Sequence, residues 1–364
     1  MIKRAWRIVT KSFPLTENKT LVVLTPGFAK DEEDSTCLPM QQSFLLTAKK
    51  IFPRLNIIVL AFQYPYHNNA YTWNGITVIP FNGQNKGGLS KFFLLRRIRS
   101  FMNSVHKKNN IDGILSFWYT ECGFAGKQFA DKYRIRHCCW IWGRDAAKEN
   151  KFPRRLKPNP NELVTLSDFL QDEFERNHKV KPLHVVPPGI HSGLFPAMLP
   201  TKDIDILAAG SLIPLKQYDI FIKVIAEIKK QIPGIKVILI GNGPEKENLE
   251  RLIRSTELES NIIMAGELPY PAVMKHMQRT RVFLHTSSYE GFGAVCLEAL
   301  HGGAYVISFT KPMNVDIPHW QVADDKEDMV QKALERLEKP VTEYFPVTPF
   351  TMEDSVRKMM NLFA

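Results

Sequence analysis

Short apolar runs alternate along this chain with stretches whose apolar residues recur every three or four positions. In the first half, five runs predict buried strands, at residues 21–25, 56–62, 76–80, 111–117 and 137–142. Between them, one face of a helix is predicted by the spacing of Phe92, Leu95, Ile98, Met102 and Val105. Alternation of this kind predicts a parallel sheet covered by helices on both faces.

The same pattern restarts after Pro187-Pro188-Gly189, whose residues form turns and suit a linker. Further strands are predicted at residues 204–209, 237–240, 262–264, 282–285 and 305–308. The fold class is therefore α/β, with two doubly wound domains at residues 1–187 and 188–340 and a final segment at 341–364. Ligands bind such sheets at the carboxyl ends of the strands, so we expect the site in the cleft between the domains.

Charge is unevenly distributed over the 364 residues, whose formal net charge is +11. Residues 35–111 hold ten Lys or Arg and no Asp or Glu. A one-sided positive field indicates an anionic partner, such as a lipid headgroup, a phosphorylated acceptor or nucleic acid. Within this stretch, the helix between Lys91 and Lys108 has two interpretations: a patch for an anionic membrane surface, or an ordinary helix that buries one face.

Cysteine usage and hydropathy argue against a disulfide-rich, a membrane-spanning and a secreted protein. The five cysteines are odd in number and form no C-x-x-C pair, which argues against a disulfide framework or a structural zinc site. No apolar run approaches the roughly 18 residues of a membrane-spanning helix, and the start of the chain lacks the apolar core of a secretory signal. We therefore expect a cytoplasmic protein, with peripheral contact to the inner membrane face as a further expectation.

The segment from Ser287 to Leu300, which reads SSYEGFGAVCLEAL, carries the densest chemical signal. Its glycines allow close backbone approach to a ligand, and the helix predicted after them offers free amides to a phosphate. Glu290 and Glu298 would lie roughly 10 Å apart along the ligand. That distance suits two hydroxyl-bearing parts of one extended molecule and exceeds the ~5 Å of a retaining hydrolase pair. The alternative is a glycine loop followed by an exposed helix glutamate.

Two more loops follow predicted strands. Gly210 and Ser211 open a loop that contains Lys216, which could reach a diphosphate or could be a solvated surface lysine. Gly241 and Gly243 flank Asn242 in a loop that fits either a phosphate site or a plain turn.

As an ordered set, these three loops resemble the retaining glycosyltransferases of family 4, which have the GT-B fold. Glu290 and Glu298 are similar to that family's E-x7-E motif. Weaker resemblances are found at Pro188-Gly189-Ile190, at residues 163–174 and at Phe350-Thr351-Met352-Glu353. In the family, the last of these segments starts a helix that crosses back onto the N-terminal domain, so the same is expected of residues 341–364.

The resemblance implies a role for each motif residue. Glu298 would hold the ribose, Glu267 and Leu268 would face the base, and Lys216 would neutralise the diphosphate that leaves. The amides of Ala294 and Val295 would meet that diphosphate, and Asp145 would lie near the 6-hydroxyl of the sugar, although a helix N-cap explains Asp145 equally well. Donor contacts are also implied for Gly27, Gly210, Ser211, Gly241, Gly243, Glu290, Gly291, Phe292 and Gly293. No metal and no cofactor would be required.

The sequence departs from the family at two places. Ser211 stands where the family has an arginine, and a serine cannot form a bidentate phosphate clamp. Lys311 and Arg144 are candidates to replace that charge. The family's G-G-x-x-E segment is also missing, because residues 309–314 read FTKPMN.

The predicted function is transfer of a sugar, with retention, from a nucleotide diphosphate sugar to an acceptor hydroxyl in glycan, polysaccharide or glycolipid synthesis. The acceptor would be a glycan or a lipid-linked molecule. The alternatives are a glycan phosphorylase or a nucleotide-sugar epimerase of the same fold, or a non-catalytic protein that binds anionic surfaces or nucleic acid. Aromatic-rich RNA-binding motifs are absent from the sequence, which disfavours nucleic acid.

Overall fold

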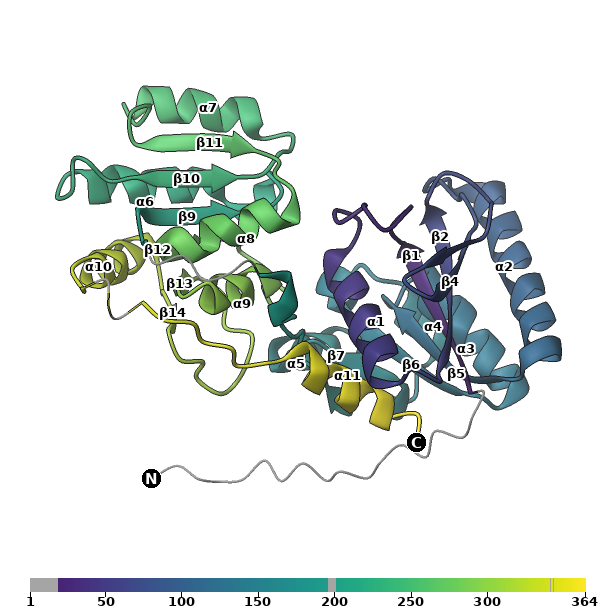
Figure 1. Ribbon diagram of the computed structural model, residues 1–364. Coiled ribbons are helices and arrows are strands. Elements are labelled where there is room, and N and C mark those ends of the chain that lie inside the picture. Colours follow the sequence, from purple (N-terminus) through teal and green to yellow (C-terminus); the bar gives the residue numbers. More distant parts are fainter. Residues whose placement is uncertain (1–18, 196–200, 341, 343) are drawn as a thin grey trace.

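A computed structural model describes residues 19–195, 201–340, 342 and 344–364 (Figure 1). The chain forms two α/β lobes, each built on one twisted sheet with helices on both faces. This is the doubly wound arrangement that the alternating apolar pattern predicts.

The N-terminal sheet has eight strands in the order β3-β4-β2-β1-β5-β6-β7-β8. All neighbours are parallel except the antiparallel pair β3 and β4. The five predicted strands are confirmed within two residues of their bounds, whereas β3 and β8 are too short for an apolar pattern to reveal. The strands are β1 (Thr20–Gly27), β2 (Asn56–Tyr64), β3 (Tyr71–Trp73), β4 (Ile76–Pro80), β5 (Ile111–Phe117), β6 (Arg136–Ile141), β7 (Leu163–Thr165) and β8 (His184–Val185).

Helices bury both faces of this sheet. Side chains of α1 and of the C-terminal α11 pack in the cluster on one face, and side chains of α2 and α3 pack on the other. The helices of this lobe are α1 (Pro39–Ile51), α2 (Gly88–Asn109), α3 (Glu121–Tyr133), α4 (Phe152–Leu156) and α5 (Asp168–His178). A 3₁₀ turn, η1 (Gly143–Ala146), follows β6.

The predicted apolar face of α2 is partly wrong. Its buried residues are Leu94, Ile98, Met102 and Val105, whereas the side chain of Phe92 is 59% exposed. Phe92 precedes Ile98 by six residues, which places it about 120° around the helix from the buried stripe. The exposed residues Leu89, Phe92 and Phe93 therefore lie at the start of α2, outside the core.

The C-terminal sheet has six parallel strands in the order β11-β10-β9-β12-β13-β14. Its strands are β9 (Ile204–Ala209), β10 (Val237–Ile240), β11 (Ile262–Gly266), β12 (Thr280–His285), β13 (Tyr305–Ser308) and β14 (Trp320–Val322). Its helices are α6 (Tyr218–Lys229), α7 (Lys246–Ser255), α8 (Tyr270–Arg279), α9 (Ala294–His301) and α10 (Lys326–Leu337). Residues of α6, α7 and α10 pack on one face, and residues of α8 and α9 pack on the other.

The backbone around Ile190, after the first lobe, pairs with the backbone around Thr351, after the second lobe. Ile190 donates a backbone hydrogen bond to Phe350 O at 3.0 Å and accepts one from Met352 N at 3.0 Å. Beyond this crossing, α11 (Met352–Asn361) lies against α1, and Nε of Arg136 donates to Leu362 O at 2.8 Å (Figure 1). The C-terminal helix therefore packs on the first lobe. Within the described part of the chain, no helix has the length and apolar character needed to cross a bilayer.

Candidate functional site

A cavity of about 550 Å³ opens where β9 and β10 end. It brings together seven of the residues that the sequence nominates: Gly210, Ser211, Lys216, Gly241, Glu267, Leu268 and Val295. The other lining residues are Ala209, Ile240, Asn242 and Val273. Its position at the carboxyl ends of parallel strands is the place where α/β sheets bind ligands.

Two of the residues that line the cavity, Gly210 and Gly241, have no side chain; we call this part of the lining the glycine floor. Gly241 donates from its amide to Gly266 O at 2.8 Å, and Gly210 donates to Ile240 O at 3.0 Å. The φ of Gly241 is +145°, and a Cβ at this position would overlap the carbonyl oxygen of Gly210. Any larger residue would therefore separate the two loops. Gly243 packs against the backbone of Leu212 and does not line the cavity.

Helix α9 begins at the rim of the cavity. Gly293, with a φ of +80°, precedes its first residue, and the first amides of a helix have no partner within it. Val295 lines the cavity, and Glu298 follows one turn later. The hydroxyl of Tyr270 donates to Oε1 of Glu298 at 2.8 Å. Burial raises the pKa of Glu298 to about 7, although the Tyr270 bond acts to lower it.

Lys216 and Glu290 form an ion pair between the loop after β9 and the loop after β12. The Nε2 atom of His285, the last residue of β12, lies 3.3 Å from the same Glu290 oxygen. Burial acts to raise the pKa of Glu290, but the contact with His285 and the charge of Lys216 outweigh it and lower the pKa to about 2. Glu290 is therefore an ionised carboxylate held by two neighbours.

The loop that carries Glu290 touches the N-terminal lobe. Tyr289 donates from its hydroxyl to Gly143 O at 3.2 Å, and Ser167 donates from its hydroxyl to Gly291 O. A Cβ on Gly291 would lie 2.8 Å from Gly143 N, so the two backbones meet with no space for a side chain. The next residues along the chain, Arg144 and Asp145, therefore lie beside the glutamate loop.

Asp145 is buried at the ends of β5 and β6. Its Oδ2 accepts hydrogen bonds from Tyr119 N at 2.7 Å and Trp142 N at 3.0 Å. Burial raises the pKa of this carboxyl to about 7, although the two amide donors act to lower it. The side chain binds the N-cap residue of η1 from the third position of that turn and is not itself the N-cap. A contact between Asp145 and a sugar stays a prediction.

Seven more nominated residues are not among those that line the cavity: Gly27, Glu290, Gly291, Phe292, Gly293, Ala294 and Glu298. Gly27 ends β1 and faces Cys37 Sγ and Tyr64 Cβ, 3.5 Å and 3.6 Å from an ideal Cβ. The side chain of Phe292 packs in the core between the rings of Trp320 and Phe350. Only the backbone of Phe292 is therefore available to a ligand.

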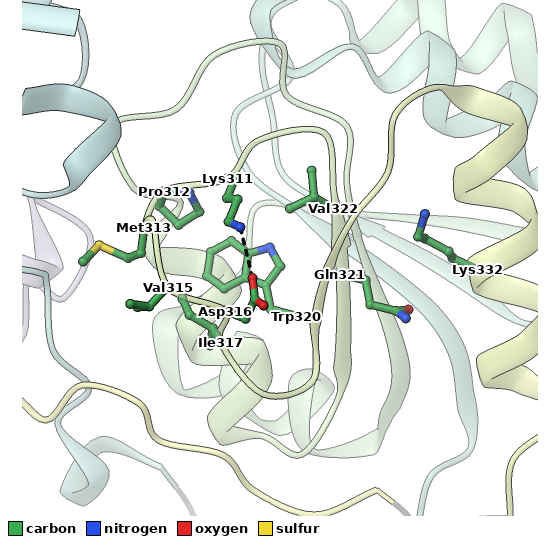
Figure 2. Close-up of a pocket in the computed structure, with 10 residues that line it drawn as sticks. All are labelled: Lys311, Pro312, Met313, Val315, Asp316, Ile317, Trp320, Gln321, Val322 and Lys332. Carbon is green, nitrogen blue, oxygen red and sulfur yellow. Dashed lines mark hydrogen bonds and ion pairs between the residues drawn. The ribbon is translucent and has the colours of Figure 1, made fainter. Parts of the chain in front are cut away.

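Neither cation that was expected to replace the missing arginine reaches this cavity. Lys311 lines a separate pocket of about 270 Å³ between its own loop and β14, and its Nζ pairs with Asp316 at 3.0 Å (Figure 2). Arg144 pairs with Glu149 at 3.8 Å on the N-terminal lobe. Among the described residues that line the cavity, Lys216 is the one cation.

Sequence reasoning missed two residues of the site, Tyr270 and His285. Tyr270 starts α8 immediately after Pro269, and nothing in the sequence links it to Glu298. His285 ends a predicted strand at the edge where ligands bind, which is a signal that could have nominated it.

Comparison with solved structures identifies the architecture. A sucrose-phosphate synthase from Thermosynechococcus elongatus aligns with a TM-score of 0.68 over 95% of this chain and 94% of that chain, at 13% identity. Anabaena Alr3699/HepE, solved in complex with UDP and glucose, aligns with a TM-score of 0.64 over 94% of this chain and 95% of that chain, at 14% identity. The fold is GT-B.

A family model matches the C-terminal lobe, and curated relatives match part of the chain. Residues 195–335 match the family model for glycosyl transferases group 1. The gpi3 subunit of a phosphatidylinositol N-acetylglucosaminyltransferase from Schizosaccharomyces pombe is 34% identical over 109 residues, 30% of this chain and 24% of that protein. A phosphatidylinositol N-acetylglucosaminyltransferase subunit from Arabidopsis thaliana is 26% identical over 185 residues, 49% of this chain and 40% of that protein. The matches span less than half of each relative.

Proposed function

We propose that this GT-B protein is a retaining glycosyltransferase that moves a sugar from a nucleoside diphosphate sugar to an acceptor hydroxyl. The observation that supports this most is the cavity, which is lined by Gly210 and Gly241, by Val295 near the start of α9, and by Lys216. Lys216 also pairs with Glu290. Its volume of about 550 Å³ suits a small-molecule ligand. The match of residues 195–335 to glycosyl transferases group 1 supports the same assignment.

Each part of the nucleotide sugar is assigned to a group of the protein. The carboxylate of Glu298 accepts from the ribose hydroxyls, and Glu267 with Leu268 faces the base. The diphosphate lies over the glycine floor, against the first amides of α9 and Nζ of Lys216. Glu290 accepts from hydroxyls of the donor sugar.

Lys216 and the helix amides supply the main catalytic effect. When the anomeric C–O bond breaks, negative charge grows on the departing diphosphate. A fixed cation and preorganised amides stabilise that charge more in the transition state than in the ground state. These groups supply positive charge without a metal, so we propose a metal-independent reaction.

Retention is assigned to a front-face displacement. Glu290 is held by Lys216 and lies 3.3 Å from Nε2 of His285, so its carboxylate is engaged and acts as a hydrogen-bond acceptor for the sugar. The acceptor hydroxyl attacks from the side on which the diphosphate leaves, and the diphosphate oxygen takes its proton. The acceptor, a glycan or glycolipid precursor, binds mainly on the N-terminal lobe at the cytoplasmic face of a membrane.

The test is thermal unfolding against UDP, GDP, ADP, CDP and dTDP, each free and with a common sugar attached, in the presence and absence of EDTA. UDP comes first, because the aligned HepE structure holds UDP. A ligand at 100 times its dissociation constant adds about 2.7 kcal/mol, which raises the unfolding temperature by several degrees. A base-specific shift that survives EDTA is the expected result. If no nucleotide shifts the transition, the proposal is wrong.

A further inference from the structure

A second cavity lies on the N-terminal lobe and has more cations than carboxylates in its lining. It has a volume of about 570 Å³ and opens where β5 and β6 end. Four cations line it: Lys91, Arg144, Lys151 and Arg155. Lys91 comes from the start of α2, whereas the other three come from residues 144–155, which are far from α2 in the sequence. The fold therefore gathers positive charge from two separate segments into one cavity.

The cations of this cavity outnumber its carboxylates. Lys91 pairs with Glu121, and Arg144 pairs with Glu149 at 3.8 Å. Asp145 also lines the cavity, but two backbone amides already occupy its Oδ2. Within the described residues, Lys151 and Arg155 have no ion-pair partner. The two ion pairs are neutral, so the remaining charges are those of Lys151, Arg155 and Asp145. Their sum is one positive charge if Asp145 is ionised and two if it is protonated.

The remaining lining residues suit a polar ligand with an apolar part. Thr120 offers a hydroxyl group, while Trp118 and Phe152 provide aromatic faces. Asn150 is fixed in place because its Nδ2 donates to Tyr119 O at 3.0 Å and to Asp145 O at 2.8 Å. Trp118 has a φ of +69°, which is unusual for a bulky residue and marks a conformation that the surroundings impose.

Lys91 and Arg155 both line this cavity. Nζ of Lys91 lies 5.6 Å from the centre of the Phe152 ring. Phe152 and Arg155 both belong to α4. Burial lowers the pKa of Lys91, and the charge of Arg155 lowers it further. A bound anion would offset the repulsion between these two cations.

The cavity adjoins the proposed reaction centre. Gly143 touches Gly291, the neighbour of Glu290, and Arg144 is the next residue along the chain. The cavity therefore belongs to the acceptor side of the cleft, in the lobe opposite the one that holds the donor cavity.

We propose that this cavity binds a phosphate group on the acceptor, so that the acceptor is a phosphorylated molecule. This inference rests on the proposed transferase function. A single phosphate fits the charge balance, because a diester carries one negative charge and a monoester about −1.5 to −2 at neutral pH. Arg144 and Arg155 provide planar donor groups that suit phosphate oxygens, and Lys151 adds a point charge.

The experiment measures binding of glycerol 3-phosphate by titration calorimetry, with glycerol and glycerate as neutral and carboxylate comparisons. The test variant is Lys151→Gln/Arg155→Gln, which removes two exposed and unpaired cations. The matched control is Arg154→Gln/Lys157→Gln, which removes the same charge from the same short segment outside the cavity. Lys216→Gln is included so that phosphate binding in the donor cavity is recognised. Circular dichroism checks that each variant is folded.

We expect the test variant to bind glycerol 3-phosphate about ten- to a hundred-fold more weakly, because charge-assisted hydrogen bonds are lost. The control and Lys216→Gln should bind as the wild type does. The proposal is overturned if the wild type shows no saturable binding, if it binds glycerate equally well, or if the test and control variants behave alike.

Vesicles distinguish the two sources of such a phosphate. The same variants are sedimented with phosphatidylcholine vesicles that contain phosphatidic acid, and with phosphatidylcholine alone. Binding to phosphatidic acid that the test variant alone loses identifies a lipid headgroup, whereas binding of glycerol 3-phosphate without vesicle binding identifies a soluble acceptor. Vesicle binding that all variants share, with no binding of glycerol 3-phosphate, overturns the cavity assignment.

The two proposals can fail separately. If the nucleotide shift is present and glycerol 3-phosphate binding is not, the transferase assignment stands and the acceptor assignment falls. If glycerol 3-phosphate binds in the cavity and no nucleotide binds anywhere, the transferase assignment falls, and the acceptor assignment falls with it.

Discussion

The hydroxyl of Tyr270 donates a hydrogen bond of 2.8 Å to Oε1 of Glu298 and thereby joins the start of α8 to α9. The carboxyl group of Glu298 is buried, so ionising it costs free energy in the unliganded protein. The ionised form is the one that would accept hydrogen bonds from ribose hydroxyls. The pKa of Glu298, about 7, reflects this cost, which the Tyr270 bond reduces. Several measurable properties of the donor site follow from this pair.

Glu298→Gln should weaken donor binding while the cavity keeps its shape. A neutral amide cannot accept charge-assisted hydrogen bonds from two ribose hydroxyls, and such bonds contribute about 1.5–3 kcal/mol. We expect affinity for the nucleotide sugar to fall about ten- to a hundred-fold by titration calorimetry. Glu259→Gln removes a solvent-exposed glutamate for which no donor contact is proposed, and it should leave affinity unchanged. Equal affinity in the two variants would remove Glu298 from the donor site.

Donor affinity should also depend on pH. The ionised form of Glu298 accepts charge-assisted hydrogen bonds from two hydroxyls, so affinity should rise with pH and level off above the pKa of about 7. The nucleotide sugar is the right probe, because a free nucleoside diphosphate has a phosphate that titrates in the same range. In Tyr270→Phe the carboxylate loses its donor, its pKa rises, and the midpoint of the profile should move to higher pH. A midpoint that does not move would separate the pH dependence from this pair.

The same carboxyl should make the free protein less stable as pH rises. The folded pKa of about 7 lies above the ordinary value of 4.5, so the native state binds the proton more tightly than the unfolded state does. This contribution to stability is present below about pH 4.5 and is lost as pH rises toward 7. Glu298→Gln should therefore raise the free energy of unfolding by about 1–3 kcal/mol at pH 8, with a smaller gain toward pH 5. Urea titrations of the unliganded proteins test this, and a destabilised variant at pH 8 would contradict it.

Much of the fold was predictable because apolar runs in buried parallel strands are long and continuous. Residues 76–80, 111–117, 204–209, 237–240 and 305–308 are strands with the predicted bounds. The loops after β9 and β10 were also found, because glycine at a strand end marks close backbone contact. Short edge strands such as β3 and β14 carry three residues each, too few to produce a periodic signal.

Contacts between segments distant in the sequence were not predictable. Tyr270 meets Glu298 only because α8 and α9 pack side by side, and Lys311 turns to Asp316 within its own loop. The positive charge of residues 35–111 predicted an anionic partner but did not locate the basic cavity. Of its four cations Lys91 alone belongs to that stretch, and the fold decides that residues 144–155 join it.

Gly291→Ala should disturb the contact between the lobes. The new Cβ would lie 2.8 Å from Gly143 N and 3.0 Å from Cδ1 of Leu170, so backbone would have to move. Overpacking of this kind costs about 1–3 kcal/mol, and it displaces Glu290 next to it. We expect a lower unfolding temperature and a lower transfer rate. Gly234→Ala is the matched control, since a Cβ there has no heavy atom within 4 Å. If Gly291→Ala and Gly234→Ala behave alike, the close approach of Gly291 to Gly143 is dispensable.

Lys216→Gln should reduce turnover far more than donor binding. Nζ of Lys216 would face the diphosphate as its charge develops, and loss of one such stabilising group costs about a hundred- to a thousand-fold in kcat. The substitution also removes the charge that helps to hold Glu290, so the pKa of Glu290 should rise from about 2 toward its ordinary value. Lys223→Gln is the control, because this lysine pairs with Asp219 on the surface of α6. Steady-state rates of transfer with a saturating donor make the comparison. A variant that loses affinity but keeps kcat would show that Lys216 binds the ground state and the transition state equally well.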